Sequence, residues 1–249
     1  MIICWDYDGT LVSSEQIYKN IFVNYLKANN LVLKDINDKD YFKKYAGKHP
    51  FNVIKIMKKD GYIKEDAFIN LDELKRVFEN ELSGNELILT KDIAYILNEI
   101  SKFDNIFMAI VTSTYRADFE AKYNNPAVKI LKNYFDINEN IYICNEVGNK
   151  ELKPSPNGYI FAYNDITKKY KLNPENNPLI MVEDSISGCK SACSAKNILE
   201  NNVNCLVVGY LVGSRFCSKE ELKEAGADVI VETKDEMLKF ISEQIKNKI

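Results

Sequence analysis

The chain begins with Ile2-Ile3-Cys4-Trp5-Asp6-Tyr7-Asp8-Gly9-Thr10-Leu11, an apolar run that ends in two carboxylates and a glycine. Residues 1–5 are rich in β-formers, and Gly9 follows too soon for a helix of ordinary length, so we predict a buried strand. Asp6 and Asp8 leave the same face of an extended chain, where two carboxylates repel unless a cation or a shared proton intervenes. Two interpretations are open: a divalent metal such as Mg²⁺, or a solvated turn after the strand.

Length and charge limit what the chain can be. It has 249 residues, 46% of them hydrophobic, and a formal net charge of -3. This length allows one α/β domain with a sizeable insertion, or two small domains, and either can bury a core. Acidic and basic residues are interspersed, so no basic stripe points to nucleic acid or to an anionic membrane surface. We expect neither as a partner.

Cysteine usage indicates the compartment. The six cysteines form no CxxC pair and the chain has one histidine, so a zinc site is poorly supplied. Several cysteines lie in apolar runs, the usual place of reduced, buried thiols. The N-terminus lacks a basic segment followed by a long apolar one, and no apolar run approaches the ~18 residues of a membrane span. These features predict a cytoplasmic protein.

A helical region follows the first strand. Ser13-x-x-Gln16 matches a capping box, and apolar residues at helical spacing predict a helix from about Ser14 to Asn29. Helical patterning continues to about residue 85, without a strand-like run. About 70 residues are too many for one crossover helix between two strands. We therefore predict two domains: an α/β core of residues 1–13 and 86–249, and a helical lobe of residues 14–85.

Short apolar strands and helices alternate in the rest of the chain. The predicted strands are 106–111, 141–144, 179–182, 205–208 and 228–231; the predicted helices are 91–100, 116–123, 128–134, one after Pro156, 187–195, 219–225 and 234–246. Such alternation predicts the α/β class with a parallel, doubly wound sheet. Ligands bind outside the carboxyl ends of strands in such sheets, so the residues just after each strand are the candidates for a site.

Three of these strand ends carry polar residues. Thr112 ends the second strand, where its hydroxyl either donates to a phosphate oxygen or caps the next helix. Arg116 close by is a substrate contact or a surface residue. Lys153 lies in a loop that two prolines make rigid, which favours a fixed position for its ammonium. Glu183 and Asp184 end the fourth strand, where two adjacent acids again invite a cation.

Together these segments resemble the haloacid dehalogenase-like (HAD) hydrolases, and they occur in that family's order. Asp6 to Val12 resembles the first motif, DxDGT[LV], and Thr112 stands where the second motif has Ser or Thr. Lys153-Pro154-Ser155-Pro156-Asn157 resembles the third motif, KPxPD, with Asn157 in place of the usual Asp. Glu183-Asp184 resembles the fourth motif in its ED form. The helical lobe lies where the family's C1-capped members carry a cap domain, and the phosphoglycolate phosphatase and β-phosphoglucomutase branches are resembled about equally.

The resemblance implies a role for each of these residues. Asp6 is then the nucleophile that becomes an aspartyl-phosphate, and Asp8 is the general acid and afterwards the general base. Thr112 and Lys153 bind the phosphoryl group. Mg²⁺ is held by Asp6, by the backbone carbonyl of Asp8 and by Asp184, with Glu183 in or near its coordination shell.

The expected function is that of an Mg²⁺-dependent phosphohydrolase acting on a small phosphorylated metabolite, as a monomer or a weak dimer. A phosphomutase of the β-phosphoglucomutase type is the alternative, and a binding module that keeps only the fold is a further one. Lys48 and His49, in the glycine-centred segment of the cap, are candidates for contact with the non-reacting end of the substrate. For His49 an ordinary surface position is the alternative.

Overall fold

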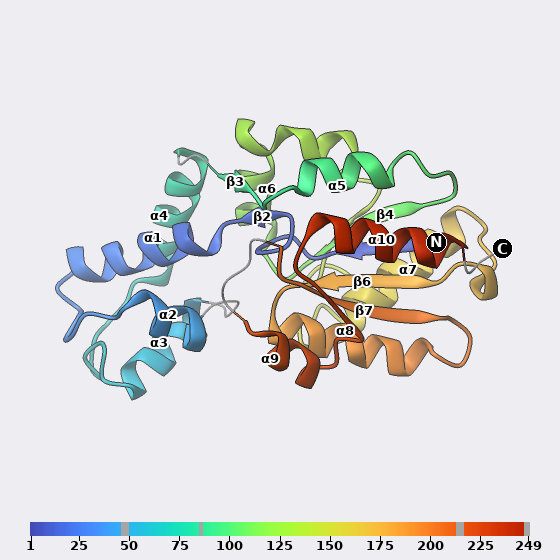
Figure 1. The fold of residues 1–249 in the computed structure, drawn as a ribbon. Helices are drawn as coiled ribbons and strands as arrows, with labels where there is room; N and C mark the ends of the chain where they lie inside the picture. Colours follow the sequence, from blue (N-terminus) through green and yellow to red (C-terminus); the bar gives the residue numbers. More distant parts are fainter. Residues whose placement is uncertain (46–49, 85–86, 213–216, 247–249) are drawn as a thin grey trace.

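A six-stranded parallel sheet forms the centre of the molecule in the computed structural model, which describes residues 1–45, 50–84, 87–212 and 217–246. The strand order is β5-β4-β1-β6-β7-β8 (Figure 1). The strands are β1 Ile2–Trp5, β4 Phe107–Thr112, β5 Ile141–Ile143, β6 Leu179–Glu183, β7 Cys205–Tyr210 and β8 Val229–Val231. The predicted α/β class with a doubly wound parallel sheet is confirmed.

The first strand is central because it pairs on both sides. Cys4 is in register with Ala109 of β4 and with Met181 of β6, and all four residues of β1 are buried. The chain builds the sheet outward from β1 to β4 and β5, and then continues on the other side with β6. In such sheets the crevice at the carboxyl ends, beside the strand where the order reverses, is the usual ligand site. Asp6 follows β1 at this point.

Helices cover both faces of the sheet, and the alternation of side chains along β1 reflects this. Ile3 and Trp5 belong to one apolar cluster, and Ile2 and Cys4 belong to the other, as the period of two requires. The first face is covered by α5 Ile93–Ile100, α6 Arg116–Tyr123, η1 Pro126–Asn133 and α10 Lys234–Lys246, and the second by α7 Asn157–Lys169, α8 Ile186–Leu199 and α9 Lys219–Glu224. A short turn of 3-10 helix, η2 Pro174–Asn176, precedes β6.

Four helices form a separate group beyond the carboxyl ends of the strands. These cap helices are α1 Glu15–Ala28, α2 Asp38–Tyr45, α3 Pro50–Lys59 and α4 Leu71–Gly84. In Figure 1 the arrows of β6 and β7 point toward them. They pack around an apolar cluster of their own, which includes Phe22, Val53 and Phe78. The boundaries of a cap at residues 14–85 stay a prediction, which this separate cluster supports.

Some local details differ from the sequence prediction. A short antiparallel pair, β2 Val12–Ser13 and β3 Ile88–Leu89, joins the cap helices to the core, and two-residue strands leave no periodic signal in the sequence. Residues of η1 form a 3-10 helix where an α-helix was predicted. The helix α8 runs to Leu199, so the connection to β7 is shorter than predicted. None of the helices within the described ranges has both the length and the apolar character of a membrane span.

The predicted capping box at the start of α1 is wrong. The helix begins one residue later, with Ser14 at the N-cap, and no side chain caps it. Ser13 lies in β2 and is exposed. The Ser14 hydroxyl donates to Oδ1 of Asp8 instead, which links the first cap helix to the second aspartate of the first motif.

Candidate active site

The turn after β1 brings Asp6 and Asp8 to the carboxyl edge of the sheet. The Asp6 amide donates to the carbonyl of Val182 at 3.0 Å, which extends the pairing with β6 by one residue. Gly9 then adopts a φ of +86°, and a Cβ atom there would lie 1.9 Å from Oδ2 of Asp184. Glycine is therefore required both by the backbone conformation and by the close approach of Asp184.

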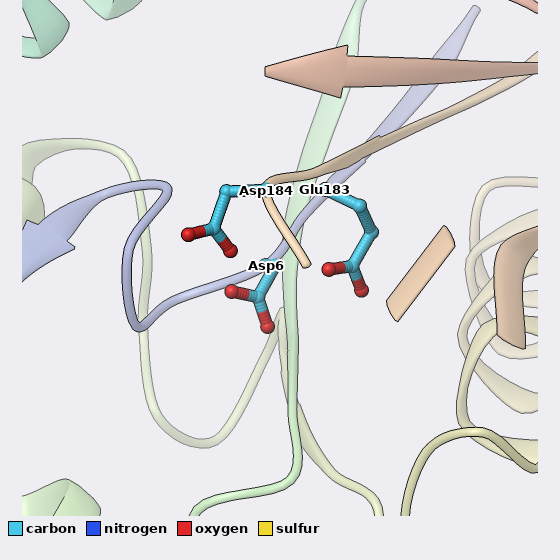
Figure 2. Close-up of side chains that lie close together, drawn as sticks. All are labelled: Asp6, Glu183 and Asp184. Carbon is cyan, nitrogen blue, oxygen red and sulfur yellow. The ribbon is translucent and has the colours of Figure 1, made fainter. Parts of the chain in front are cut away.

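Three carboxylates converge at this edge. Asp6, Glu183 and Asp184 are buried, and one oxygen from each lies within 4.8 Å of the others (Figure 2). Burial raises the pKa of each. Repulsion by the Asp6 carboxylate raises the pKa values of Glu183 and Asp184 further, and repulsion by Asp8 raises that of Asp6. Oε2 of Glu183 is buried and has no hydrogen-bond partner. A dense group of acids with an unsatisfied oxygen has the chemistry of a divalent-cation site.

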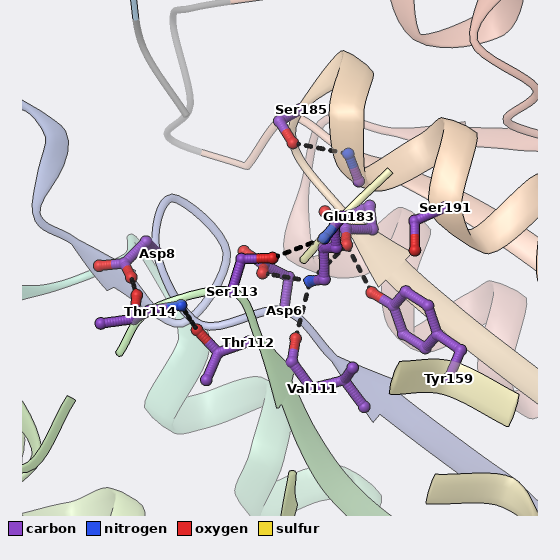
Figure 3. A network of polar contacts seen from close by, with 12 residues as sticks. Asp6, Asp8, Val111, Thr112, Ser113, Thr114, Tyr159, Glu183, Ser185 and Ser191 are labelled. Carbon is purple, nitrogen blue, oxygen red and sulfur yellow. Dashed lines mark hydrogen bonds and ion pairs between the residues drawn. The ribbon is translucent and has the colours of Figure 1, made fainter. Parts of the chain in front are cut away.

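Lys153 reaches into the same cluster. Its Nζ lies 2.6 Å from Oδ1 of Asp6 and 2.7 Å from Oε1 of Glu183, and it donates to the carbonyl of Val111 at 2.7 Å. Its backbone amide donates to the Ser113 hydroxyl at 2.9 Å, which fixes the loop against the end of β4 (Figure 3). Burial opposes the charged form, but Asp6 and Glu183 outweigh it and raise the pKa of Lys153. One ammonium therefore faces three carboxylates, which leaves negative charge for a bound cation to balance.

Asp8 lies apart from this cluster, with other partners. Its Oδ1 accepts hydrogen bonds from Ser14 and from the fully buried Lys122, and its Oδ2 accepts from Thr114. Figure 3 shows the Asp8 carboxylate turned toward Thr114, apart from Asp6 and Glu183. Burial raises the pKa of Asp8, but the ion pair with Lys122 outweighs burial, and the net pKa is lowered. The two aspartates of the first motif are thus in different electrostatic environments.

The other residues proposed from the sequence lie in several places. Thr112 is buried at the end of β4, where its Oγ1 accepts from the Thr114 amide at 3.0 Å, and it lines the cavity described below. Arg116 is not part of that lining; its guanidinium pairs with Glu146 instead. Lys48 and His49 lie outside the described residues. Asn157, the departure from the third motif, donates to Oε2 of Glu151 at 2.5 Å.

Lys122 and Tyr159 were not proposed from the sequence. The Tyr159 hydroxyl donates to Oε1 of Glu183, the oxygen that Lys153 also contacts. For Lys122 the sequence did hold a signal. It follows the buried Phe119 by three residues and so lies on the same face of α6, which points into the core. A charged side chain on a buried helical face needs a partner, so the spacing to Phe119 could have indicated that Lys122 is a buried, paired lysine.

A cavity of about 720 Å³ opens above these residues, between the sheet edge and the cap helices. The core contributes Asp6, Asp8, Lys153 and Asp184 to its wall. The cap helices contribute mainly aromatic side chains, with a few polar ones: Tyr18, Phe22, Tyr41, Tyr45, Phe78, Glu15, Asn52 and Lys55. The carboxylates and the lysine therefore face a space large enough for a small organic molecule.

The comparison with protein families is decisive. The model of the haloacid dehalogenase-like hydrolases matches residues 3–198. The chain belongs to this family. The resemblance on the four motifs is thereby confirmed, and the carboxylates and the lysine of this HAD hydrolase lie together at the sheet edge as the motif order implies. No curated protein matches the chain significantly by sequence.

Solved structures agree with this HAD hydrolase in fold. A haloacid dehalogenase-like protein of unknown function from Agrobacterium tumefaciens has a TM-score of 0.74 at 18% identity, and 98% of each chain is covered. A predicted phosphoglycolate phosphatase from Haemophilus somnus has a TM-score of 0.66 at 21% identity, with 96% of this chain and 97% of that chain covered. A β-phosphoglucomutase candidate from Thermotoga maritima has a TM-score of 0.65 at 21% identity, with 97% and 98% covered.

Proposed function

We propose that this HAD hydrolase is an Mg²⁺-dependent phosphatase that cleaves a small organic phosphomonoester through an aspartyl-phosphate on Asp6. The observation that carries the proposal is the contact between Asp6 and Lys153 inside a group of three buried acids. A carboxylate attacks a phosphate ester only where positive charge offsets the repulsion between the two anions. The lysine supplies part of that charge, and the acids are suited to hold more.

In the first half of the reaction, the Asp6 carboxylate attacks phosphorus and the bond from phosphorus to the ester oxygen breaks. Asp8 gives a proton to the leaving oxygen, and Lys153 stabilises the charge on the transferring phosphoryl group. In the second half, Asp8 takes a proton from a water molecule, which attacks the aspartyl-phosphate and releases phosphate.

The acids fit an Mg²⁺ ion. Asp6, Asp184 and the backbone carbonyl of Asp8 would hold it, with Glu183 as a further ligand or as the group that keeps Lys153 in place. When bound, the ion neutralises negative charge on the nucleophile and the phosphoryl oxygens. The orphaned Oε2 of Glu183 supports a cation in this position.

The cavity supports a small organic phosphate as the substrate. Its wall is formed by aromatic and polar side chains of the cap helices opposite Asp6, so the group that leaves with the ester oxygen would lie among them. Small phosphorylated metabolites have the matching size and charge.

Phosphate release from a panel of phosphomonoesters with Mg²⁺ tests the proposal, with 4-nitrophenyl phosphate as the generic member. We expect turnover by the wild-type protein, and neither turnover nor a trapped aspartyl-phosphate with Asp6→Asn. Asp104→Asn, an exposed aspartate of the core, is the matched control and keeps wild-type activity. Full turnover by Asp6→Asn contradicts the mechanism. Conversion of β-glucose 1-phosphate into glucose 6-phosphate without free phosphate identifies a mutase instead.

A further inference from the structure

A second buried cation lies beside the site, and neither the motifs nor the proposed reaction steps give it a task. The Lys122 side chain in α6 is 0% exposed, and its Nζ forms an ion pair with Oδ1 of Asp8. An ammonium is costly to bury unless it is paired and hydrogen-bonded. Asp8 supplies that partner, so the lysine and the aspartate depend on each other.

Lys122 also lies at the junction between the core and the cap helices. Its Nζ is 3.4 Å from Oγ1 of Thr114, 5.2 Å from the centre of the Tyr7 ring and 4.9 Å from the centre of the Tyr18 ring. Both ring distances are within the range of cation–π attraction. Tyr18 belongs to α1 and lines the cavity. The ammonium is therefore held from the core side and from the first cap helix.

The carboxylate of Asp8 is fixed by groups from three segments. Lys122 of α6 and Ser14 at the start of α1 donate to Oδ1, and Thr114 after β4 donates to Oδ2. A hydroxyl both donates and accepts, whereas a lysine ammonium only donates. Lys122 therefore commits Oδ1 to its own hydrogen bond. Oδ2 is left as the oxygen that can carry a proton, because its partner, the Thr114 hydroxyl, can change from hydrogen-bond donor to acceptor.

We propose that Lys122 is a positioning residue that orients Asp8 for proton transfer to the leaving oxygen. The inference rests on the proposed phosphatase activity. The proton on Oδ2 of Asp8 passes to the ester oxygen as the bond to phosphorus breaks, and the carboxylate that remains is paired with Lys122. Without the ammonium, Asp8 keeps two hydroxyl partners but loses the charged group that fixes Oδ1.

The dependence on the leaving group separates positioning from a general loss of structure. Phenyl phosphate and 4-nitrophenyl phosphate are similar in shape, but nitrophenolate leaves readily without a proton and phenolate does not. For Lys122→Met we expect kcat/KM to fall by about tenfold or more on phenyl phosphate and by less than about threefold on 4-nitrophenyl phosphate. The ratio kcat/KM includes the steps only up to the aspartyl-phosphate, so slow hydrolysis of that intermediate does not affect it.

Four further variants complete the design. Asp8→Ala has the same selectivity for the nitrophenyl ester, and adding Lys122→Met to it gives no further loss, because both act through one group. Lys122→Arg keeps the cation and regains part of the activity on phenyl phosphate. Lys129→Met, an exposed lysine of η1, is the matched control and leaves both substrates unchanged.

The failure of this inference differs from the failure of the proposed function. A wild-type protein without activity on either ester contradicts the phosphatase. An active wild-type protein with an equal loss on both esters in Lys122→Met, with no loss, or with a further loss in the double variant contradicts the role of Lys122. If Lys122→Met does not fold, Lys122→Gln takes its place and the same change in the ratio of the two kcat/KM values decides.

Discussion

Nζ of Lys153 lies 2.6 Å from Oδ1 of Asp6, although 147 residues separate the two in the sequence. The same ammonium lies 2.7 Å from Glu183, so one cation joins the proposed nucleophile to a second buried acid. The contact forms because β1 and β6 are neighbours in the sheet and the lysine loop is fixed to the end of β4 through Ser113. The sheet topology thus brings the two carboxylates together, and the ammonium of Lys153 offsets the repulsion between them.

Lys153→Met should remove most of the activity. The variant leaves three buried carboxylates without their ammonium and takes away positive charge from the transferring phosphoryl group, so we expect kcat to fall by about 10²–10³-fold. Lys150→Met changes an exposed lysine of the same loop and should keep wild-type kcat. Phosphate release at saturating substrate measures both. Retention of more than about a tenth of the wild-type kcat in Lys153→Met argues against a role at phosphorus.

Gly188→Ala should disturb the site although alanine is the better helix former by about 1 kcal/mol. A Cβ atom at position 188 would lie 1.7 Å from Oε2 of Glu183. That carboxylate is buried, and its other oxygen is held by Lys153 and Tyr159, so it has little room to move. Overpacking of this kind costs about 1–3 kcal/mol.

We therefore expect a lower melting temperature and a lower kcat for Gly188→Ala, measured by thermal unfolding and by phosphate release. Ser194→Ala, in the middle of the same helix, serves as the control and should change neither. An unchanged melting temperature in Gly188→Ala contradicts the close packing of Glu183 against α8.

The sequence predicted the parts of the site that follow from sheet topology. Asp6, Thr112 and Asp184 each stand at the end of an apolar strand, and in a parallel sheet those ends share one edge. This prediction does not depend on side-chain conformation, because the position of a residue at the end of its strand places it at the carboxyl edge of the sheet.

The sequence did not predict contacts that depend on side-chain direction. The predicted capping box was Ser13-x-x-Gln16, but Ser14 is the N-cap of α1 and its hydroxyl donates to Asp8. Lys122 is a helix-favouring residue in an amphipathic stretch, and only the packing of α6 decides that it points inward. Likewise, Arg116 follows a strand end as a phosphate-binding residue would, but Glu146 offers it a bidentate partner on the surface. Which of several possible partners a side chain contacts in the folded protein cannot be inferred from residue spacing.

Asn157→Asp restores the residue that the third motif usually has, and we expect it to lower stability. Asn157 donates to Oε2 of Glu151 at 2.5 Å, and aspartate would place a second carboxylate there. The start of α7 favours an acid by about 0.3–1 kcal/mol, but the lost hydrogen bond to a charged group is worth about 1.5 kcal/mol or more. The melting temperature should fall by roughly 1–3 °C. Adding Glu151→Gln should reverse the loss, and a stabilised single variant would show that the two side chains do not meet.

The stability of the metal-free protein should fall as the pH rises. Burial raises the pKa of Glu183 from its ordinary value of 4.5 to about 7, and burial also raises the pKa values of Asp6 and Asp184. A carboxyl whose pKa is raised by folding binds its proton more tightly in the folded state. It therefore opposes folding once the pH exceeds its unfolded value, and the full cost is reached above its folded value. For Glu183 this window runs from about pH 4.5 to about pH 7.

Thermal unfolding in EDTA should thus give a melting temperature that declines between about pH 5 and about pH 8. Asp8 does not contribute to this decline, since its pKa is lowered and its effect lies at more acidic pH. Added Mg²⁺ should raise the melting temperature more at the upper end of this range than at the lower end, because protons compete with the ion for the same oxygens. Asp184→Asn removes one of the acids and should flatten both the decline and the effect of Mg²⁺. A decline that persists unchanged in Asp184→Asn would contradict a contribution of Asp184 to the pH dependence.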